Sequence, residues 1–274
     1  MFFRKKMPIV KQVEIEKKEF SSFGFNDILY YVKREIGVDL FSKKGIIETK
    51  MRLFCLDRDI YSFKELNDEI KYKGELRQEL INLLTVNETY FYREEKQLQE
   101  AVDFAKTKGN NVNILCAPCA SGEEVYTLSM MLNEQLSTRF TVTGIDVNSE
   151  AIEKANNGLY TQRALHKLDD FLKQKYFTTE EDKFRINKHL FTSVNFKQVN
   201  IFENSFLSMG SFDIIFSRNM LIYFDNEFRV ATMKRFNQLL RNDGRVYLGH
   251  ADIVPKNEWF DKNGFGSSCY YTKP

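Results

Sequence analysis

The first 86 residues follow a helical pattern of hydrophobic and polar positions. From Asn26, apolar residues recur three and four positions apart as far as Ile36, and Gly37 then predicts the end of the helix. Three further segments have helical spacing: 43–56, 62–70 and 74–85. The block Ser62-Phe-Lys-Glu65 has the pattern of an N-terminal capping box. We therefore expect a helical N-terminal domain at residues 1–86.

After Asn87 the pattern changes to alternating strands and helices. Short apolar runs predict strands over 112–116, 140–145, 212–216 and 244–249. Helical spacing predicts helices over 122–136, 149–157 and 225–240. Asn242-Asp-Gly244 predicts a tight turn before the last strand. Strands separated by helices indicate an α/β domain at 87–274, with a mostly parallel sheet and right-handed crossovers.

The alternation breaks between Tyr160 and Asn200. Residues 165–176 have helical spacing, and three short segments are partly alternating: 184–187, 189–192 and 194–197. These features predict a small antiparallel β-subdomain inserted at about 165–199.

Composition and charge narrow the class of protein. The chain has 274 residues, of which 43% are hydrophobic, which is sufficient for a core. Its 40 Lys and Arg against 38 Asp and Glu give a net charge of +2, and this near-neutrality argues against a nucleic-acid partner. The first 86 residues contain 17 basic and 14 acidic residues, a mild net charge of +3.

The sequence also indicates the compartment. No apolar run approaches the ~18 residues of a membrane span. Met1–Lys6 is charged but is not followed by an apolar stretch of the signal-peptide kind. The four cysteines do not form a disulfide framework. We expect a cytoplasmic protein.

Aromatic residues are unusually frequent, with 25 Phe and 13 Tyr. They indicate either a Phe-rich core or stacking on a planar ligand, and the core is the favoured interpretation.

A loop of small residues, Ala117-Pro-Cys-Ala-Ser-Gly-Glu-Glu124, follows the first predicted strand. Open α/β sheets bind ligands at this position, and small residues let a ligand approach the backbone. The loop lacks the G-x-G-x-x-G pattern, however, and two carboxylates stand at the start of the following helix. Carboxylates are favourable there but would repel a pyrophosphate, which argues against NAD or ATP.

Asp146 ends the second predicted strand. An acidic residue at this position accepts hydrogen bonds from the hydroxyl groups of a ribose. Together with the small-residue loop, it predicts an adenosine-bearing cofactor without phosphates. S-adenosylmethionine fits, and the fold class would be that of a Rossmann-like methyltransferase.

Several blocks in order make the resemblance specific: Asn87-Glu-Thr-Tyr-Phe-Tyr-Arg93, Ala120-Ser-Gly-Glu-Glu-Val-Tyr126, Gly158-Leu-Tyr160, Phe212-Asp-Ile-Ile-Phe-Ser-Arg-Asn-Met-Leu-Ile-Tyr-Phe-Asp225 and Gly249-His250. They resemble the signature blocks of the CheR family, the chemotaxis-receptor glutamate methyltransferases. The resemblance runs from about Phe25 to the end of the sequence. It implies the helical domain, the inserted β-subdomain, S-adenosylmethionine as cofactor and S-adenosylhomocysteine as product.

The resemblance also implies roles for individual residues. The cofactor-binding positions are Asn87, Thr89, Arg93, Glu124, Asp146, Asn200, Ile201, Ser217 and Arg218. Among these, Glu124 would receive the amino group of the methionine moiety. Arg93, Arg218 and Tyr223 would be the catalytic residues. The sequence departs from the family pattern at Ile201 and Ser217, where Leu and Cys are usual. It departs again at Gly249-His-Ala-Asp252, where the family has Gly-His-Ser-Glu, and we expect this change to affect only a peripheral contact.

The implied chemistry agrees with the residue types present. A glutamate acceptor has an ordinary pKa near 4.3, so it is already a nucleophilic carboxylate at pH 7. No general base is required, and no His or Cys–His arrangement of the catalytic kind occurs in the sequence. Arg93 and Arg218 would position carboxylates, while the alternative for each is a surface ion pair.

Other features have plainer interpretations. Cys116-x-x-Cys119 has metal-knuckle spacing but no second pair, so packing beside the loop is favoured over a redox role. The three histidines have no ligand spacing, and we expect no metal. Two alternative functions stay open: methylation of RNA or a small molecule, and a regulatory module that binds the cofactor without transfer.

The resemblance implies a partner as well. In the family, basic N-terminal helices contact the methylated helices of chemotaxis receptors. The helix at 43–56 contains Lys43, Lys44, Lys50 and Arg52 but also Glu48, so it is only mildly basic. We expect the cytoplasmic helical domains of receptors as partners, no nucleic acid, no direct membrane insertion and a monomer. Nothing in the insertion indicates whether it binds a receptor-tail peptide.

Overall fold

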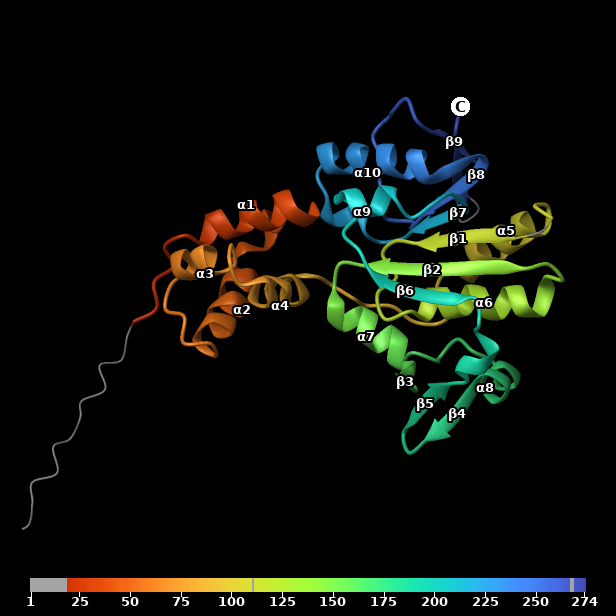
Figure 1. Cartoon of the computed structure of the whole chain (residues 1–274), viewed down its shortest axis with the longest axis horizontal. Coiled ribbons are helices and arrows are strands. Elements are labelled where there is room, and N and C mark those ends of the chain that lie inside the picture. The colour runs from red at the N-terminus through yellow and green to blue at the C-terminus, as the bar shows by residue number, and fades with distance from the viewer. Residues whose placement is uncertain (1–18, 110, 267–268) are drawn as a thin grey trace, which may run out of the picture.

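The computed structural model describes residues 19–109, 111–266 and 269–274. The interpretation of Met1–Lys6 therefore lies outside the described residues. Figure 1 shows a helical unit beside a larger α/β unit that carries a small second sheet. In the described part of the chain, no helix is both long enough and apolar enough to cross a membrane.

From residue 19 onward, the helical unit contains four α-helices and one 3₁₀ helix: α1 (Phe25–Ile36), η1 (Phe41–Lys43), α2 (Lys44–Leu56), α3 (Phe63–Glu69) and α4 (Gly74–Leu84). In α1, the helically spaced Ile28, Leu29 and Val32 are fully buried, and Gly37 ends the helix with a φ of 77°. The cap predicted at α3 is confirmed, because the Glu65 amide donates to Ser62 Oγ over 3.1 Å.

A seven-stranded sheet forms the centre of the larger unit, in the order β6-β2-β1-β7-β8-β10-β9. Its strands are β1 (Val112–Cys116), β2 (Phe140–Asp146), β6 (Val194–Gln198), β7 (Phe212–Ser217), β8 (Leu240–Leu248), β9 (Asp261–Asn263) and β10 (Tyr270–Thr272). The strands from β6 to β8 are parallel, whereas β10 and β9 are antiparallel additions at the far edge. The predicted α/β Rossmann-like class is confirmed.

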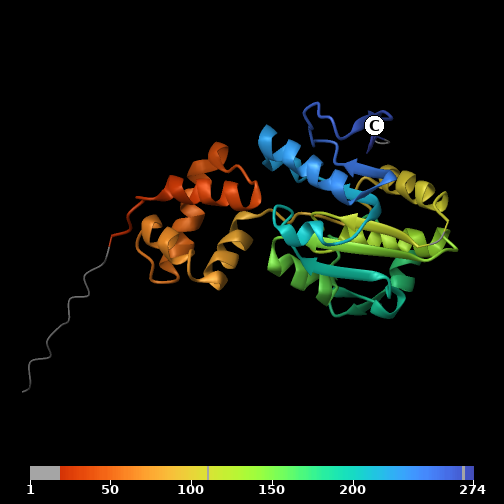
Figure 2. The same ribbon diagram turned by 45° about the horizontal axis from the view of Figure 1, so that its top comes forward.

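Helices cover both faces of this sheet (Figures 1 and 2). One face packs on α5 (Glu95–Lys106), α6 (Glu123–Gln135) and α7 (Ser149–Asn157), and the other on α9 (Asn204–Leu207) and α10 (Asn226–Leu239). Successive residues of β1 alternate between these two cores, since Ile114 faces one and Leu115 the other. Both faces are therefore buried, as parallel sheets require.

The second sheet has three antiparallel strands in the order β3-β5-β4. They are β3 (Leu159–Thr161), β5 (Lys183–Ile186) and β4 (Phe177–Glu180), with α8 (Asp170–Tyr176) and the 3₁₀ helix η2 (Lys188–Leu190) beside them. Aromatic residues fill its core, where Phe91 packs edge-on against Tyr160 and Phe177. Much of the aromatic excess is therefore core, as the sequence favoured.

Three local predictions in this region are corrected. Residues 189–192 form no strand, because Lys188–Leu190 is a 3₁₀ helix. The segment at 194–198 is a strand, but it pairs with β2 in the main sheet rather than with the insertion. The helix predicted over 165–176 is confined to Asp170–Tyr176, because Asp169 caps it.

The tight turn predicted at Asn242–Gly244 is also wrong, because β8 continues through it. Phe212 pairs with Leu240 and Ile214 with Arg245, so the intervening residues leave the ladder as a bulge. The side chain of Asp213 accepts from Arg241 over 2.8 Å, which holds the bulge against β7. This tertiary contact overrides the local turn signal.

Two sets of polar contacts attach the helical unit to the larger one. On one side, Asn82 donates to Ser149 Oγ over 2.9 Å. On the other side, Lys33 pairs with Asp39 at 2.9 Å and Asp225 at 2.6 Å. The Asp39 amide donates to the carbonyl of Tyr223 over 2.8 Å. The space between these attachments is a cleft that both units line.

Candidate active site

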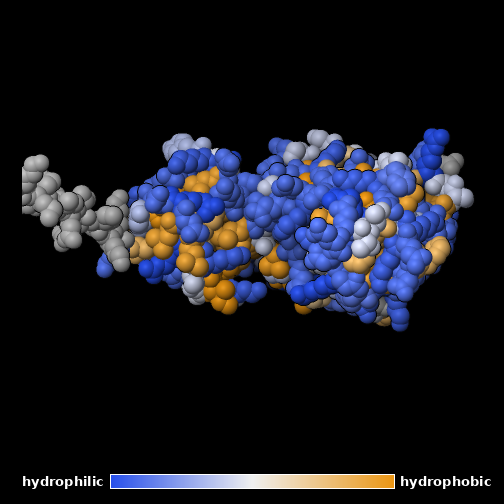
Figure 3. Space-filling model, turned by 90° about the horizontal axis from the view of Figure 1, so that it is seen from below, coloured by the Kyte–Doolittle hydropathy of each residue, from blue (hydrophilic) through white to orange (hydrophobic). Residues whose placement is uncertain are grey.

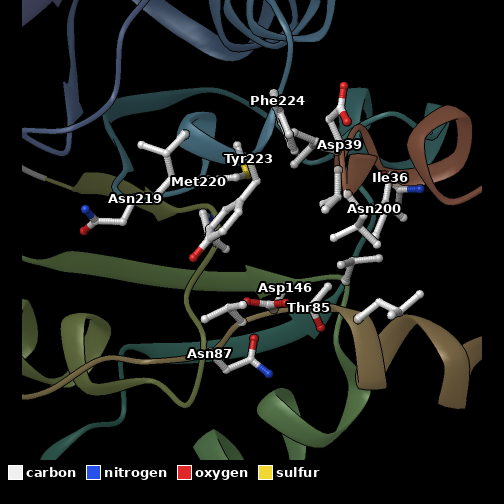
Figure 4. A pocket seen from close by; sticks show the side chains of 18 of the residues that line it. Ile36, Asp39, Thr85, Asn87, Asp146, Asn200, Asn219, Met220, Tyr223 and Phe224 are labelled. Carbon is white, nitrogen blue, oxygen red and sulfur yellow. The ribbon is translucent and has the colours of Figure 1, made fainter. Parts of the chain in front are cut away.

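Two adjoining cavities lie at the carboxyl ends of the parallel strands. The first has a volume of about 350 Å³ and the second of about 240 Å³. The two cavities share five of their lining residues: Val86, Pro118, Asn219, Ile222 and Tyr223. They therefore form one continuous cleft with two ends, and Figure 4 shows the first of the two cavities.

The first cavity lies between the helical unit and the sheet. Ile36, Leu40 and Ile47 form its wall on the helical side. Ile145 and Ile201 form the opposite wall at the ends of the sheet. An apolar slot with a few polar groups at its rim suits a flat heterocycle.

The loop after β1 forms the floor between the two ends. The Cys119 amide donates to the carbonyl of Ile145 over 2.8 Å, which ties the loop to β2. Gly122 has a φ of 92°, and a Cβ there would lie 2.9 Å from the Ala155 Cβ. Glycine is therefore required where the loop passes into α6.

Asp146 stands at the end of β2, as predicted, and lines the first cavity (Figure 4). Its carboxylate accepts from the Ala120 amide and the Asn148 amide, both over 2.9 Å. Burial raises the pKa of this carboxyl, and the two amide donors oppose that shift. With its orientation fixed by these amides, its remaining lone pairs can accept from hydroxyl groups of a ligand.

Glu124 and Arg218 form a buried ion pair at the second cavity. Their Oε2 and Nε atoms are 3.1 Å apart, and the side chains are only 12% and 3% exposed. The Arg218 guanidinium also donates to the carbonyl of Arg93 over 2.6 Å. Burial raises the pKa of Glu124, although Arg218 lowers it.

This ion pair is not saturated by hydrogen bonds. Among the described residues, Glu124 Oε1 and Arg218 Nη1 are buried without a hydrogen-bond partner. A buried acceptor beside a buried donor is costly unless a ligand meets both. The pair is therefore complementary to a zwitterion, with the ammonium on Glu124 and the carboxylate on Arg218.

Arg93 and Tyr223 lie at the open end of the cleft. Arg93 is half-buried, and it donates to the carbonyl of Glu88 over 3.1 Å. The ring of Tyr223 projects into the cavity between Asn219 and Asp146 (Figure 4). Burial raises the pKa of Tyr223, so its hydroxyl remains a hydrogen-bond donor at neutral pH. Thr89 lines the same end.

The remaining predicted site residues have different surroundings. Asn87, Asn200 and Ile201 line the first cavity, but the Asn200 amide is occupied by the carbonyl of Glu35 at 2.8 Å. Ser217 is fully buried and lines neither cavity. The structure thus brings all the predicted site residues to the cleft except Ser217, which lies behind it.

Comparison with known proteins agrees with this geometry. A family model described as "CheR methyltransferase, SAM binding domain" matches residues 87–268. This chain belongs to the CheR family. A chemotaxis protein methyltransferase of Campylobacter jejuni (strain 81-176) is 39% identical over 254 residues, which covers 92% of this chain and 97% of that protein. A chemotaxis protein methyltransferase of Escherichia coli (strain K12) is 32% identical and covers 86% of each chain.

The residues of the cleft fit the CheR cofactor, S-adenosylmethionine. The apolar slot suits adenine, Asp146 suits the ribose hydroxyls, and the unsaturated Glu124–Arg218 pair suits the methionine zwitterion. The protein is therefore an S-adenosylmethionine-dependent methyltransferase. Within the described residues, no cluster of His, Cys, Asp and Glu is suited to a metal ion. Cys116 and Cys119 are free and buried beside the loop.

Sequence reasoning missed part of this CheR site. The wall from the helical unit was not predicted, because its residues are ordinary core-type side chains. Glu94 lies 3.8 Å from Arg218, and the ring of the exposed His250 lies 2.8 Å from Glu94, so polar side chains continue from the buried pair to the surface. Among the sequence blocks discussed above, Gly249–Asp252 was the signal for these residues behind Arg218, because it contains His250.

Proposed function

We propose that the protein transfers the methyl group of S-adenosylmethionine to glutamate side chains of chemotaxis receptors and so forms glutamate methyl esters. The observation that carries this proposal is the two-ended cleft. The residues that fit the cofactor line both cavities, and the second cavity also opens outward beside Arg93 and Tyr223. The relatives named chemotaxis protein methyltransferase support the choice of acceptor.

Glu124, Arg218 and Asp146 would hold the cofactor and orient its sulfonium toward the open end. When bound, the cofactor supplies an electrophilic methyl group. In this proposal Asn87, Thr89, Asn200 and Ile201 complete the cofactor contacts, and Ser217 supports them from behind. Fixing both reactants in one geometry is worth roughly 7–11 kcal/mol of the barrier in favourable cases.

Arg93 and Tyr223 would receive the acceptor. The guanidinium pairs with the glutamate carboxylate, and the Tyr223 hydroxyl donates to the same group. Arg218 is turned toward Glu124, so it acts mainly on the cofactor side. Because the acceptor is already ionised at pH 7, these residues need only orient and partly desolvate it.

Helix α2 is the element best placed to meet a receptor helix. Ile46 and Leu53 are one heptad apart on α2, and their side chains are 75% and 59% exposed. Exposed Lys44 and Arg52 accompany them. Apolar groups appear over the helical unit in Figure 3. A helical partner with acidic residues beside an apolar stripe would match this face.

The test incubates the protein with methyl-labelled S-adenosylmethionine and the purified signalling domain of a receptor. We expect label in the receptor that base releases as methanol, which identifies a carboxyl ester. Arg93→Ala should lower the rate about 100-fold. Arg163→Ala is the matched control, because Arg163 is an 87% exposed arginine that lines neither cavity. Cofactor binding without transfer to any acidic helical substrate would contradict the proposal.

A further inference from the structure

A buried carboxylate stands directly behind the active-site segment. Asp252 ends a short turn, Gly249–Asp252, that follows strand β8, and it is only 8% exposed. The segment in front of it, residues 218–223, carries both Arg218 and Tyr223. Asp252 lines neither cavity, so it does not itself meet the cofactor or the acceptor.

The Asp252 carboxylate accepts three hydrogen bonds from backbone amides. Its Oδ2 accepts from Asn219 over 2.6 Å and from Gly249 over 2.9 Å, and its Oδ1 accepts from Ile222 over 3.1 Å. Two of these three donors belong to the active-site segment. Charge-assisted bonds to buried amides are stronger than ordinary ones, so they fix the backbone between Asn219 and Ile222.

The backbone that Asp252 holds is unfavourable without support. Asn219 has a φ of 59°, in the left-handed region that few non-glycine residues adopt. Asn219 lines both cavities and lies between the two catalytic side chains in sequence. A residue in this conformation persists only where its surroundings determine it.

The backbone of the Gly249–Asp252 turn packs directly against the backbone of the active-site segment. A Cβ on Gly249 would lie 2.8 Å from the Asn219 nitrogen and 2.9 Å from Asp252 Oδ2. Such a contact requires glycine. The neighbouring His250 pairs with Glu94, which faces Arg218, so the same turn supports the site from a second direction.

We infer that Asp252 is a positioning residue, whose carboxylate fixes the backbone of 219–222 and thereby aims Arg218 and Tyr223 into the cleft. This role goes beyond the peripheral contact that the sequence led us to expect at this position. The inference concerns the cofactor cleft, and it rests on the proposed function only where methyl transfer to a receptor is the readout.

The test compares Asp252→Asn and Asp252→Glu with a matched control. In Asp252→Asn, the amide NH₂ must face at least one backbone N–H, so the three bonds cannot all form. Asp252→Glu retains the acceptor. Asp213→Asn is the control, because Asp213 is also buried and also accepts a hydrogen bond from a backbone amide, that of Asn113, over 2.8 Å. Asp213 lies near the start of β7, whereas the segment that Asp252 contacts follows the end of this strand.

We expect Asp252→Asn to weaken S-adenosylhomocysteine binding about fivefold in calorimetry and to lower kcat about tenfold. In Asp252→Glu, both the Kd for S-adenosylhomocysteine and kcat should stay within about threefold of the wild-type values. Asp213→Asn should lower the urea midpoint but leave both readouts within about twofold. If Asp252→Asn does not fold, Asp252→Ser, which leaves one acceptor, takes its place with the same expectation.

The inference is overturned if folded Asp252→Asn binds and turns over like the wild type, or if Asp213→Asn loses binding and kcat in step with its stability. Failure of the proposed function gives a different result. The wild type would then methylate no receptor, while the binding difference between the Asp252 and Asp213 variants would persist.

Discussion

At the residue scale, Glu123 and Glu124 are sequence neighbours in very different surroundings. Glu124 faces Arg218 in the second cavity, whereas Glu123 lines neither cavity and accepts from Ser121 Oγ over 2.8 Å. Both are buried at the start of α6. Replacing Glu124 should therefore affect cofactor binding, whereas replacing Glu123 should affect folding stability. Each substitution is a control for the other.

Replacing Glu124 should impair cofactor binding. In Glu124→Gln the carboxylate that would receive the cofactor ammonium is lost, and the buried Arg218 keeps only the more distant Glu94, at 3.8 Å, as an acidic partner. Losing one partner of a buried charge pair typically costs about 2–5 kcal/mol. We expect at least about a tenfold rise in the Kd for S-adenosylhomocysteine, measured by calorimetry. Glu123→Gln should change this Kd less than about threefold, and equal losses in the two variants would contradict the assignment.

Glu123 should make stability depend on pH. Burial raises its pKa to about 7 from an ordinary 4.5. The folded protein therefore holds this proton more tightly than the unfolded chain does. The free energy of unfolding should therefore fall as the pH rises from 4.5 to 7. Above pH 7 the total loss should be roughly 3 kcal/mol.

Urea unfolding at pH 5 and pH 8 measures this effect. Glu123→Gln removes the titration, so its stability relative to the wild type should improve by more than about 1 kcal/mol between the two pH values. Glu95→Gln removes an exposed carboxylate instead, and its difference from the wild type should stay constant within about 0.5 kcal/mol. The same difference at both pH values for Glu123→Gln would refute the burial argument.

Sequence reasoning at this scale found residues that line the cleft but not those that hold them in place. Asp146 and Glu124 were predictable because a strand end and a helix start have fixed places in an α/β sheet. Asp252 was not, because its partners are backbone amides that a sequence does not display. Ser217 shows the converse, since a position inside a signature block can be buried behind the site.

At the element scale, local signals predicted what local forces determine. The strand over Val112–Cys116 and the helix over Ser149–Asn157 were placed correctly, since apolar runs and caps define them. The error at Asn242–Gly244 arose because this segment is a bulge within β8, which Asp213 of β7 holds through Arg241. The pairing of β6 with β2 was equally unpredictable, because strand pairing depends on contacts between segments far apart in sequence.

Helix α2 should determine how tightly the receptor binds. Leu53→Glu places a charge on the exposed apolar stripe, so we expect about a fivefold rise in KM for the receptor domain. The Kd for S-adenosylhomocysteine should not change, because Leu53 lines neither cavity. Phe265→Glu is the control, since Phe265 is 96% exposed on the loop between β9 and β10. An unchanged KM in Leu53→Glu would remove α2 from the proposed interface.

At the scale of the whole molecule, the cofactor cleft belongs to both units. Ligand at 100 times its Kd should stabilise the protein by about 2.7 kcal/mol. Because Ile36 and residues 38–40 line the cleft together with 199–201, amide exchange should slow in both segments when S-adenosylhomocysteine is added. Hydrogen-exchange mass spectrometry measures this, with β9 as an internal reference. Slowing confined to 199–201 would show that the helical unit does not close on the cofactor.

The position of the Gly249–Asp252 turn has a consequence for synthesis of the protein. The chain emerges from the ribosome N-terminus first, so the cofactor loop, Arg218 and Tyr223 all appear before the carboxylate that holds them. A nascent chain that has reached only Leu248 contains all the residues that line the two cavities but not Asp252. By our inference, the cofactor site is therefore completed only after residues 249–252 have been synthesised and Asp252 has bound the backbone of 219–222.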